Sequence, residues 1–311
     1  MIFSYKTESG QLAEQTNVCP GNWIHVVGPT KEELEEVARA TGVLPEFLQA
    51  ALDEEETPRI DKEDEQTLIL VDIPVVEPEG TSFVYNTLPL GIVITETNII
   101  TVCLEETTII EDFCRGRVRG FDCAKKTRFV YQLLYKISSR FLQYLRQIDK
   151  AKTQVESALQ KSLKNRELIQ MLKLEKSLVF FSTSLKANEI VMEKMLKTNV
   201  LKRYPDDEEL LEDVIIENKQ AIEMCTIYRD ILSGTMDAFA SVISNNLNIV
   251  MKFLTSVTII LSIPTLFFSM WGMNVDVPFG NGMRGGFMIV TGIAIVSTII
   301  VTVILWRRKM L

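Results

Sequence analysis

The pattern of apolar and polar positions first predicts a region of short strands and helices. Four runs rich in apolar and β-branched residues predict strands at Trp23–Val27, Leu68–Val76, Phe83–Thr95 and Asn98–Leu104. Between the first two runs, Thr30-Lys31-Glu32-Glu33 has the capping-box pattern and predicts a helix to about Ala40. Pro45 predicts the start of a second short helix that ends near Asp53. We therefore expect a mixed α/β domain over residues 1–124.

The pattern changes to a helical one after this region. Between Lys125 and Lys202 there is no Pro or Gly, and Leu recurs at helical spacing. This predicts long antiparallel helices over residues 125–205, with breaks around 164–166 and 203–205. A final helix begins near Asp206 and continues to Trp271, which would make it roughly 100 Å long. Its first part, residues 206–250, is expected to form a stalk that leads into a membrane span.

Two long apolar runs close the chain and predict membrane spans. Phe253–Trp271 and Gly286–Trp306 have 19 and 21 residues without a charge, so each helix would reach about 30 Å, the thickness of the hydrocarbon core. Each run carries Trp at one end, where the indole suits the headgroup level. The connection is short, so we expect a hairpin with spans over 251–271 and 286–306 and a loop over 272–285.

The charge distribution orients this hairpin. Residues 251–311 contain five basic side chains and one acidic one, a net charge of +4, so residues 1–250 carry −12 of the total −8. Lys252 and the basic tail at 307–311 flank one side, and Arg284 alone lies on the other. The positive-inside rule then predicts a multi-pass protein of the cell membrane with both termini in the cytoplasm. Met1–Gly10 has neither a basic nor an apolar segment, so no signal peptide is expected.

Composition excludes several function classes. A net charge of −8 argues against binding to nucleic acid. The single histidine, His25, excludes a multi-histidine metal site, and the five cysteines form no C-x-x-C pair. The chain has no phosphate-binding G-x-x-x-x-G-K-[ST] motif and no G-x-S-x-G motif. We therefore expect neither an enzyme nor an organic cofactor.

A stripe of small and polar residues follows the predicted stalk and first span at steps of four and three. Its members are Asp237, Ser241, Ser244, Asn248, Met251, Thr255, Thr258, Ser262 and Thr265. This 3.5-residue period places them on one helix face. The face could serve helix–helix packing, with hydroxyls bonded back to the helix. Alternatively, several copies of the helix could surround a water-filled pore, which would require a homo-oligomer.

The end of the first span resembles a known family. Trp271-Gly272-Met273-Asn274 resembles the Y-G-M-N signature of CorA-type divalent-cation transporters, with Trp in place of Tyr. Pro264-Thr265-Leu266 and the Ser244–Lys252 segment match the P-T-L and S-N-x-x-N-x-x-M-K patterns of that family, and the basic tail is similar as well. The resemblance covers the architecture of the whole chain and the sequence detail of its last third.

The resemblance implies a funnel-shaped homopentamer in the lipid bilayer that conducts Mg²⁺ and other divalent cations. It implies an extracellular selectivity filter formed by rings of Gly272, Met273 and Asn274. It also implies that the pore is lined by the first span and the stalk, through Asp237, Ser244, Asn248, Met251, Leu254, Thr258, Ser262 and Thr265. Met251 and Leu254 match the hydrophobic constriction of the family. Asp276 could attract cations at the mouth or could be a solvated loop residue.

The resemblance also implies regulation by cytoplasmic Mg²⁺ held between subunits. Carboxylates cluster at residues 53–65 and 206–223. Asp213 falls at the matching stalk position, whereas Ala50 stands where the family has its partner aspartate. We therefore expect an altered site that uses Asp53 or Glu54, although a run of charges can also be a solvated face.

Two questions stay open at the level of sequence. The stretch Val277-Pro278-Phe279-Gly280 stands where relatives often have M-P-E-L, and the ion could be Zn²⁺, Co²⁺ or Ni²⁺ instead of Mg²⁺. A non-conducting membrane-anchored scaffold is the alternative from a different class. The stretch Lys125–Lys176, with 13 basic and four acidic side chains, predicts either a partner surface for acidic regions or a solvated helix face.

Overall fold

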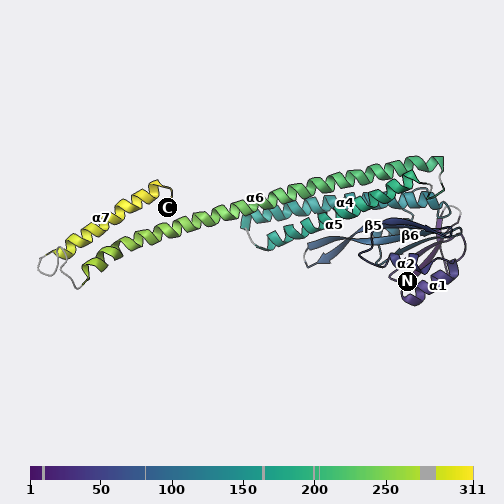
Figure 1. Cartoon of the computed structure of the whole chain (residues 1–311), viewed down its shortest axis with the longest axis horizontal. Helices are drawn as coiled ribbons and strands as arrows, with labels where there is room; N and C mark the ends of the chain where they lie inside the picture. Colours follow the sequence, from purple (N-terminus) through teal and green to yellow (C-terminus); the bar gives the residue numbers. More distant parts are fainter. Residues whose placement is uncertain are drawn as a thin grey trace. The chain divides into compact units, whose positions relative to one another are not determined.

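The computed structural model of the chain describes residues 1–8, 11–80, 82–162, 165–198, 200–202, 204–273 and 285–310. Its contacts divide the chain into two units, Met1–Gly234 and Thr235–Leu311. We call them unit 1 and unit 2 (Figure 1).

Unit 1 contains a seven-stranded sheet. The strands are β1 (Ile2–Glu8), β2 (Gln11–Gln15), β3 (Trp23–Val27), β4 (Arg59–Glu63), β5 (Gln66–Glu79), β6 (Ser82–Ile94) and β7 (Ile99–Cys103). Their order across the sheet is β2-β1-β3-β7-β6-β5-β4. Only the central pair β3–β7 is parallel, and β5 and β6 form a long antiparallel hairpin.

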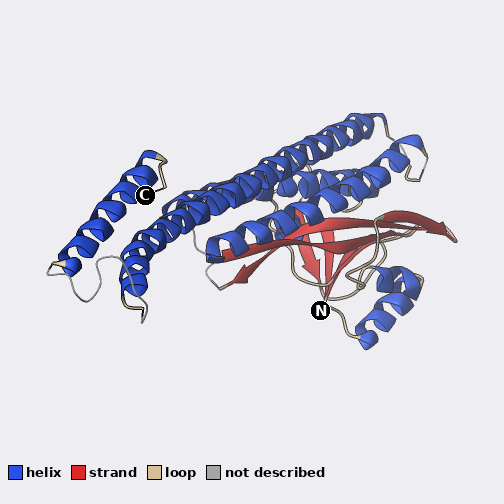
Figure 2. Cartoon of the chain, turned by 60° about the vertical axis from the view of Figure 1, so that its left-hand side comes forward, coloured by secondary structure: helices blue, strands red, loops and turns tan. Residues whose placement is uncertain are grey.

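Helices cover both faces of this sheet. Unit 1 has α1 (Lys31–Thr41), α2 (Pro45–Ala50), α3 (Thr108–Cys114), α4 (Lys126–Ser162), α5 (Asn165–Lys197) and the first part of α6 (Pro205–Trp271). Figure 2 shows α1 and α2 on one side of the strands and the long helices on the other. The fold class expected from the sequence, an α/β domain followed by long helices, is therefore confirmed.

The central strand β3 shows why the sheet is covered on both faces. All five of its residues are buried. Since successive side chains of a strand point to opposite faces, both faces of the sheet must be covered here. Ile24 and Val26 belong to the apolar cluster with α1 and α2. Trp23 points the other way, where the rings of Phe113 and Phe129 lie 6.4 and 4.9 Å from its own. A continuous apolar run in the sequence therefore indicated this strand.

The four predicted strands are all present, but β1, β2, β4 and α3 were missed. The sequence of β4 is Arg-Ile-Asp-Lys-Glu, and only Ile60 of it is buried, so it lacks the apolar content that marks the central strands. It lies at the edge of the sheet, where a strand can be polar because one side faces water. The predicted helix breaks near 164–166 and 203–205 are confirmed, because α5 begins at Asn165 and α6 at Pro205.

Unit 2 is a helical hairpin. Its helices are the last part of α6 and α7 (Gly286–Arg307). At one end, the Ser256 hydroxyl donates a hydrogen bond to the carbonyl oxygen of Met310 at 2.9 Å. At the other end, the rings of Trp271 and Phe287 lie 6.1 Å apart. The two helices are therefore antiparallel neighbours, as the short connection predicted.

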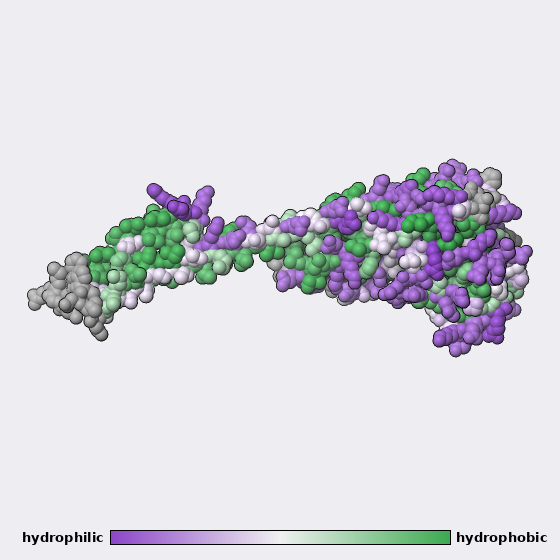
Figure 3. Space-filling view, in the orientation of Figure 1, coloured by the Kyte–Doolittle hydropathy of each residue, from purple (hydrophilic) through white to green (hydrophobic). Residues whose placement is uncertain are grey.

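Both helices are long and apolar enough to span a membrane, with mean hydropathies of 1.8 and 2.7 in their most apolar stretches. Figure 3 shows the apolar surface of unit 2, with hydrophilic residues gathered near the C-terminus. The cations at Arg307, Arg308 and Lys309 end the hairpin in the way that a span ends at a headgroup layer.

Candidate ion pathway

The polar stripe lies on an exposed face of α6. All eight predicted pore-lining side chains are exposed in the chain: Asp237, Ser244, Asn248, Met251, Leu254, Thr258, Ser262 and Thr265. They all belong to unit 2. A shallow groove follows part of this face and is lined by Thr258, Ser262, Thr265 and Ser269, together with two leucines. The structure therefore brings the sequence-predicted residues together on one surface.

The opposite side of α6 is the side that α7 covers. Ser256 has no exposed surface, and its hydroxyl bonds to the chain end that follows α7. On α7, Val290, Ala294 and Leu305 are buried. Because α7 packs against the side with Ser256, it leaves the stripe exposed, although Thr258 and Ser262 line a groove together with Ser297 and Val301 of α7. Among the described residues, α7 therefore packs on a different side of α6 and only borders the stripe.

The hydroxyls of the stripe bond to their own helix. Thr258 donates to the carbonyl oxygen of Leu254 at 2.9 Å, Ser262 to that of Thr258 at 2.8 Å, and Thr265 to that of Leu261 at 3.0 Å. This is the pattern of back-bonding expected for Ser and Thr inside a span. The hydroxyl proton is used in each case, whereas the lone pairs of the oxygen stay available as acceptors.

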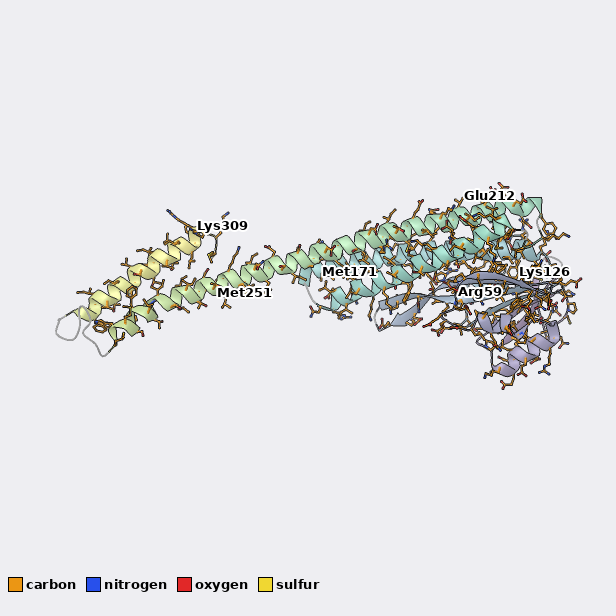
Figure 4. All side chains as sticks on the ribbon, in the orientation of Figure 1. Arg59, Lys126, Met171, Glu212, Met251 and Lys309 are labelled. Carbon is orange, nitrogen blue, oxygen red and sulfur yellow. The ribbon has the colours of Figure 1, made fainter. Side chains whose placement is uncertain are left out.

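Two apolar residues of the predicted pore lining, Met251 of the stripe and Leu254 beside it, lie at the start of the predicted span. Met251 and Leu254 are 52% and 57% exposed, although both are large and hydrophobic. Figure 4 labels Met251 on α6. Exposed apolar side chains at the level of a membrane interface can face lipid or, in an assembly, other copies of the same helix. Their role as a constriction stays a prediction.

The signature motif begins inside the described part of the chain and continues beyond it. The N–H of Gly272 donates to the carbonyl oxygen of Phe268 at 2.9 Å, and a Cβ at Gly272 would lie only 3.2 Å from that oxygen. Met273 follows and is exposed. Asn274 and Asp276 lie outside the described residues. Trp271, which replaces the tyrosine of the family motif, packs against Phe287 and joins the two spans at this end.

The predicted regulatory residues are exposed carboxylates of unit 1. Asp213 lies on α6, and Asp53 and Glu54 lie in the turn after α2. Asp53 accepts a hydrogen bond from the N–H of Glu55 at 3.0 Å. Among the described residues, no group of three or more His, Cys, Asp or Glu side chains lies close enough to hold a metal ion. The three residues therefore form no site within one chain, and a site between subunits stays a prediction.

Sequence reasoning missed one detail and left another, the role of the basic stretch 125–176, between two alternatives. The buried Ser256 lies off the stripe, and its only signal was a second hydroxyl residue beside Thr255. The basic stretch from Lys125 to Lys176 supplies part of the packing of unit 1, because several of its cations pair with acidic residues outside it. These cations are Arg128, Lys136, Arg140 and Lys173.

Comparison with known proteins supports a transporter. The chain is 28% identical to the cobalt/magnesium transport protein CorA of Methanocaldococcus jannaschii, over 92% of this chain and 90% of that protein. The complete structure of the CorA magnesium transporter from the same organism matches with a TM-score of 0.84 at 24% identity. That match covers 98% of this chain and 96% of the other.

A more distant structure has the same fold. The full-length CmaX protein matches with a TM-score of 0.71 at 17% identity, over 99% of this chain and 97% of that one. The family model described as CorA-like Mg²⁺ transporter protein matches residues 21–309. This match confirms the family predicted from the signature motif and the prediction of a transporter in place of an enzyme. The chain belongs to the family of CorA-like Mg²⁺ transporter proteins.

Proposed function

We propose that several copies of this chain, five by resemblance to the family, surround a pore that conducts Mg²⁺ into the cytoplasm. The observation that carries the proposal is the exposed polar stripe of α6. Lipid does not favour a face with Thr258, Ser262 and Thr265, and α7 covers a different side of the helix. Further copies of α6 around a wet axis would give this face a polar environment.

The hydroxyls of the stripe suit a hydrated cation. Mg²⁺ binds its water tightly, so a pore is expected to pass the ion with its inner shell intact. Such an ion presents water hydrogens outward and needs acceptors around it. Thr258, Ser262 and Thr265 already donate their protons to the helix, so the free side of each oxygen offers lone pairs only.

The signature motif would select the ion at the outer mouth. The amide oxygen of Asn274 would accept hydrogen bonds from the bound water, and Gly272 would allow the backbone to approach closely. Asp276 would concentrate cations before this ring. Met251 and Leu254 would close the inner end by excluding water. The driving force needs no ATP, because two charges gain about 4.6 kcal/mol per 100 mV of membrane potential.

Cytoplasmic Mg²⁺ would regulate the pore through carboxylates of neighbouring subunits. Asp213 is exposed on α6 and is free to face another copy, with Asp53 or Glu54 as its partner. An ion that binds only the closed state stabilises that state, and its loss leaves repelling carboxylates. Asp213→Lys should therefore change the Mg²⁺ concentration that inhibits flux. An unchanged concentration would remove Asp213 from the proposal.

Two alternatives are tested by the same measurement. The relative from M. jannaschii is named for cobalt as well as magnesium, so Co²⁺ is the second candidate ion, followed by Zn²⁺ and Ni²⁺. A scaffold that conducts nothing is the candidate from a different class.

The decisive experiment is flux through the purified chain in liposomes at a set voltage, with Mg²⁺, Co²⁺ and Zn²⁺ in turn. We expect voltage-dependent Mg²⁺ flux and its loss in Asn274→Ala. Asn246→Ala is the matched control, since Asn246 is an exposed asparagine of α6 that does not belong to the stripe. A scaffold would show no flux in any variant, and full flux in Asn274→Ala would exclude the proposed filter.

A further inference from the structure

Unit 1 contains a cavity that the transport function does not use. Its volume is about 610 Å³, within the range of small-molecule sites. Its walls come from the β4–β5 turn, the β6–β7 turn, the first turn of α4, and residues 200–202 and 204 between α5 and α6. All of its lining residues belong to unit 1, and Figure 4 labels one of them, Lys126.

The charge of the cavity is opposite to that of the protein. Five cations among the described residues line it: Lys62, Lys125, Lys126, Arg128 and Lys202. Three carboxylates accompany them: Glu65, Glu96 and Asp207. The difference leaves two positive charges in the cavity, whereas the whole chain has a net charge of −8. A concave site with a surplus of cations attracts anions.

The start of α4 adds to this positive potential. A helix N-terminus is positive, so acidic side chains are favoured in the first turn. The first turn of α4, a helix of 37 residues, contains none. Instead it carries Lys126 and Arg128, with Lys125 immediately before it. These cations repel the helix dipole and one another, and an anion in the cavity would offset that repulsion.

Two of the cations are held in place by the walls. The ammonium group of Lys126 donates to the carbonyl oxygens of Thr95 and Glu96 at 2.9 and 2.8 Å. Burial lowers its pKa. The guanidinium of Arg128 lies 3.3 Å from the carboxylate of the buried Asp207. These contacts fix the positions of charge before any ligand binds, which lowers the cost of ordering the site.

The other cations are free to contact a ligand. Lys62 and Lys125 are exposed and form no ion pair with any residue that the structure describes. The ammonium group of Lys202 lies 5.5 Å from the centre of the Tyr204 ring. Tyr204 is 45% exposed and lines the same cavity, so it offers an aromatic face beside the cations.

We propose that this cavity binds an organic anion of the nucleoside phosphate class. The phosphates would lie against Lys62, Lys125 and the first turn of α4, and would accept hydrogen bonds from ammonium groups and from backbone N–H groups of that turn. The base would lie against Tyr204. The cavity volume fits such a molecule, and the pairing of a cationic wall with an aromatic residue matches its two chemical parts.

The test uses ATP as the probe and the full-length chain in detergent. Titration calorimetry should show saturable binding of one ATP per chain. Lys62→Gln and Lys125→Gln should each raise the Kd about tenfold, because each removes one charge-assisted contact. Lys150→Gln is the matched control, an exposed lysine of α4 outside the cavity, and should leave the Kd unchanged.

A second arm separates the two parts of the ligand. Tyr204→Leu should raise the Kd for ATP and leave that for inorganic tripolyphosphate unchanged. The absence of saturable binding at 1 mM ATP would overturn the proposal, and so would equal weakening by Lys125→Gln and Lys150→Gln. Equal affinity for ATP and tripolyphosphate would overturn the nucleoside assignment. The measurement records binding alone, so its result is independent of ion flux.

Discussion

The two units treat their polar side chains differently. In unit 1, buried polar groups bond across elements. The amide of Asn188 on α5 accepts from the N–H of Asp72 on β5 at 2.9 Å and donates to its carbonyl oxygen at 2.8 Å. In unit 2, the hydroxyls of Thr258 and Ser262 bond only to their own helix and stay exposed. Asn188 therefore joins two elements of one chain, whereas Thr258 and Ser262 join α6 to no second element among the described residues.

The largest predicted effect is the loss of stability of unit 1 when Asn188 is replaced. The side chain is fully buried and lies beyond the last β4–β5 pair, Arg59 with Leu70, so it satisfies backbone groups that no further residue of β4 reaches. Asn188→Ala leaves the partly buried N–H and carbonyl of Asp72 unpaired. We expect a loss of about 4 kcal/mol in the unfolding free energy of unit 1.

Denaturant unfolding followed by circular dichroism measures this loss. The exposed Asn246 in unit 2 is again the control, and Asn246→Ala should change the unfolding free energy by less than about 0.5 kcal/mol. Similar losses of unfolding free energy in the two variants would show that Asn188 contributes no more to stability than an exposed asparagine of unit 2.

The ionisation of Asp72 is expected to lower the unfolding free energy of unit 1 by a somewhat smaller amount, which depends on pH. Burial raises the pKa of its carboxyl from 3.8 to about 6, against a hydrogen bond from Ser184 that lowers it. Because the folded pKa lies above the unfolded one, the folded state favours the protonated form. Stability is therefore lost as pH rises from about 4 to 6, by up to about 3 kcal/mol.

Asp72→Asn removes this cost. The variant should be more stable than the parent chain at pH 7.5, and the contribution from ionisation should vanish below about pH 3. His25 titrates with the opposite sign, since burial lowers its pKa to about 4 and its charging destabilises unit 1 as pH falls from 6.5. Comparing the two chains at each pH isolates Asp72, and a difference independent of pH would contradict the assignment.

The sequence predicted the central strands and the hairpin because each rests on a long apolar run. It missed β4, where Ile60 is the only buried residue, because the strand is defined by its neighbour and not by its own pattern. It could not predict the close packing of α2 on β6, where a Cβ at Gly91 would lie 2.6 Å from that of Ala51. Such contacts depend on tertiary packing.

The candidate site could also be predicted only as far as it depends on local helix geometry. The period of the stripe predicted which side chains share a face, since helix geometry alone determines that. The helix side that α7 covers could not be predicted, because both sides carry hydroxyls, and Ser256 became distinct only through its bond to Met310. The cavity in unit 1 depends on turns that are far apart in the sequence.

The smallest predicted effect is the loss of Mg²⁺ flux when one hydrogen-bond acceptor of the stripe, the hydroxyl oxygen of Thr258, is removed. Thr258→Val keeps the shape of the side chain and removes its oxygen. We expect Mg²⁺ flux to fall about tenfold, equivalent to about 1.4 kcal/mol, with no change in the unfolding of unit 1. Thr298→Val on α7 is the matched control, since Thr298 is only partly exposed and also bonds to its own helix. Equal effects at the two positions would remove the stripe from the ion path.

The most direct test of the central claim is the accessibility of the stripe to water in the assembled protein. Thr258→Cys and Ile299→Cys, an exposed apolar position of α7, would be compared in liposomes after replacement of the exposed Cys19 by Ser. A charged thiol reagent should modify the cysteine at 258 and block Mg²⁺ flux, and it should leave the one at 299 unmodified. Protection of both positions, or modification of 299 alone, would contradict a pore lined by α6.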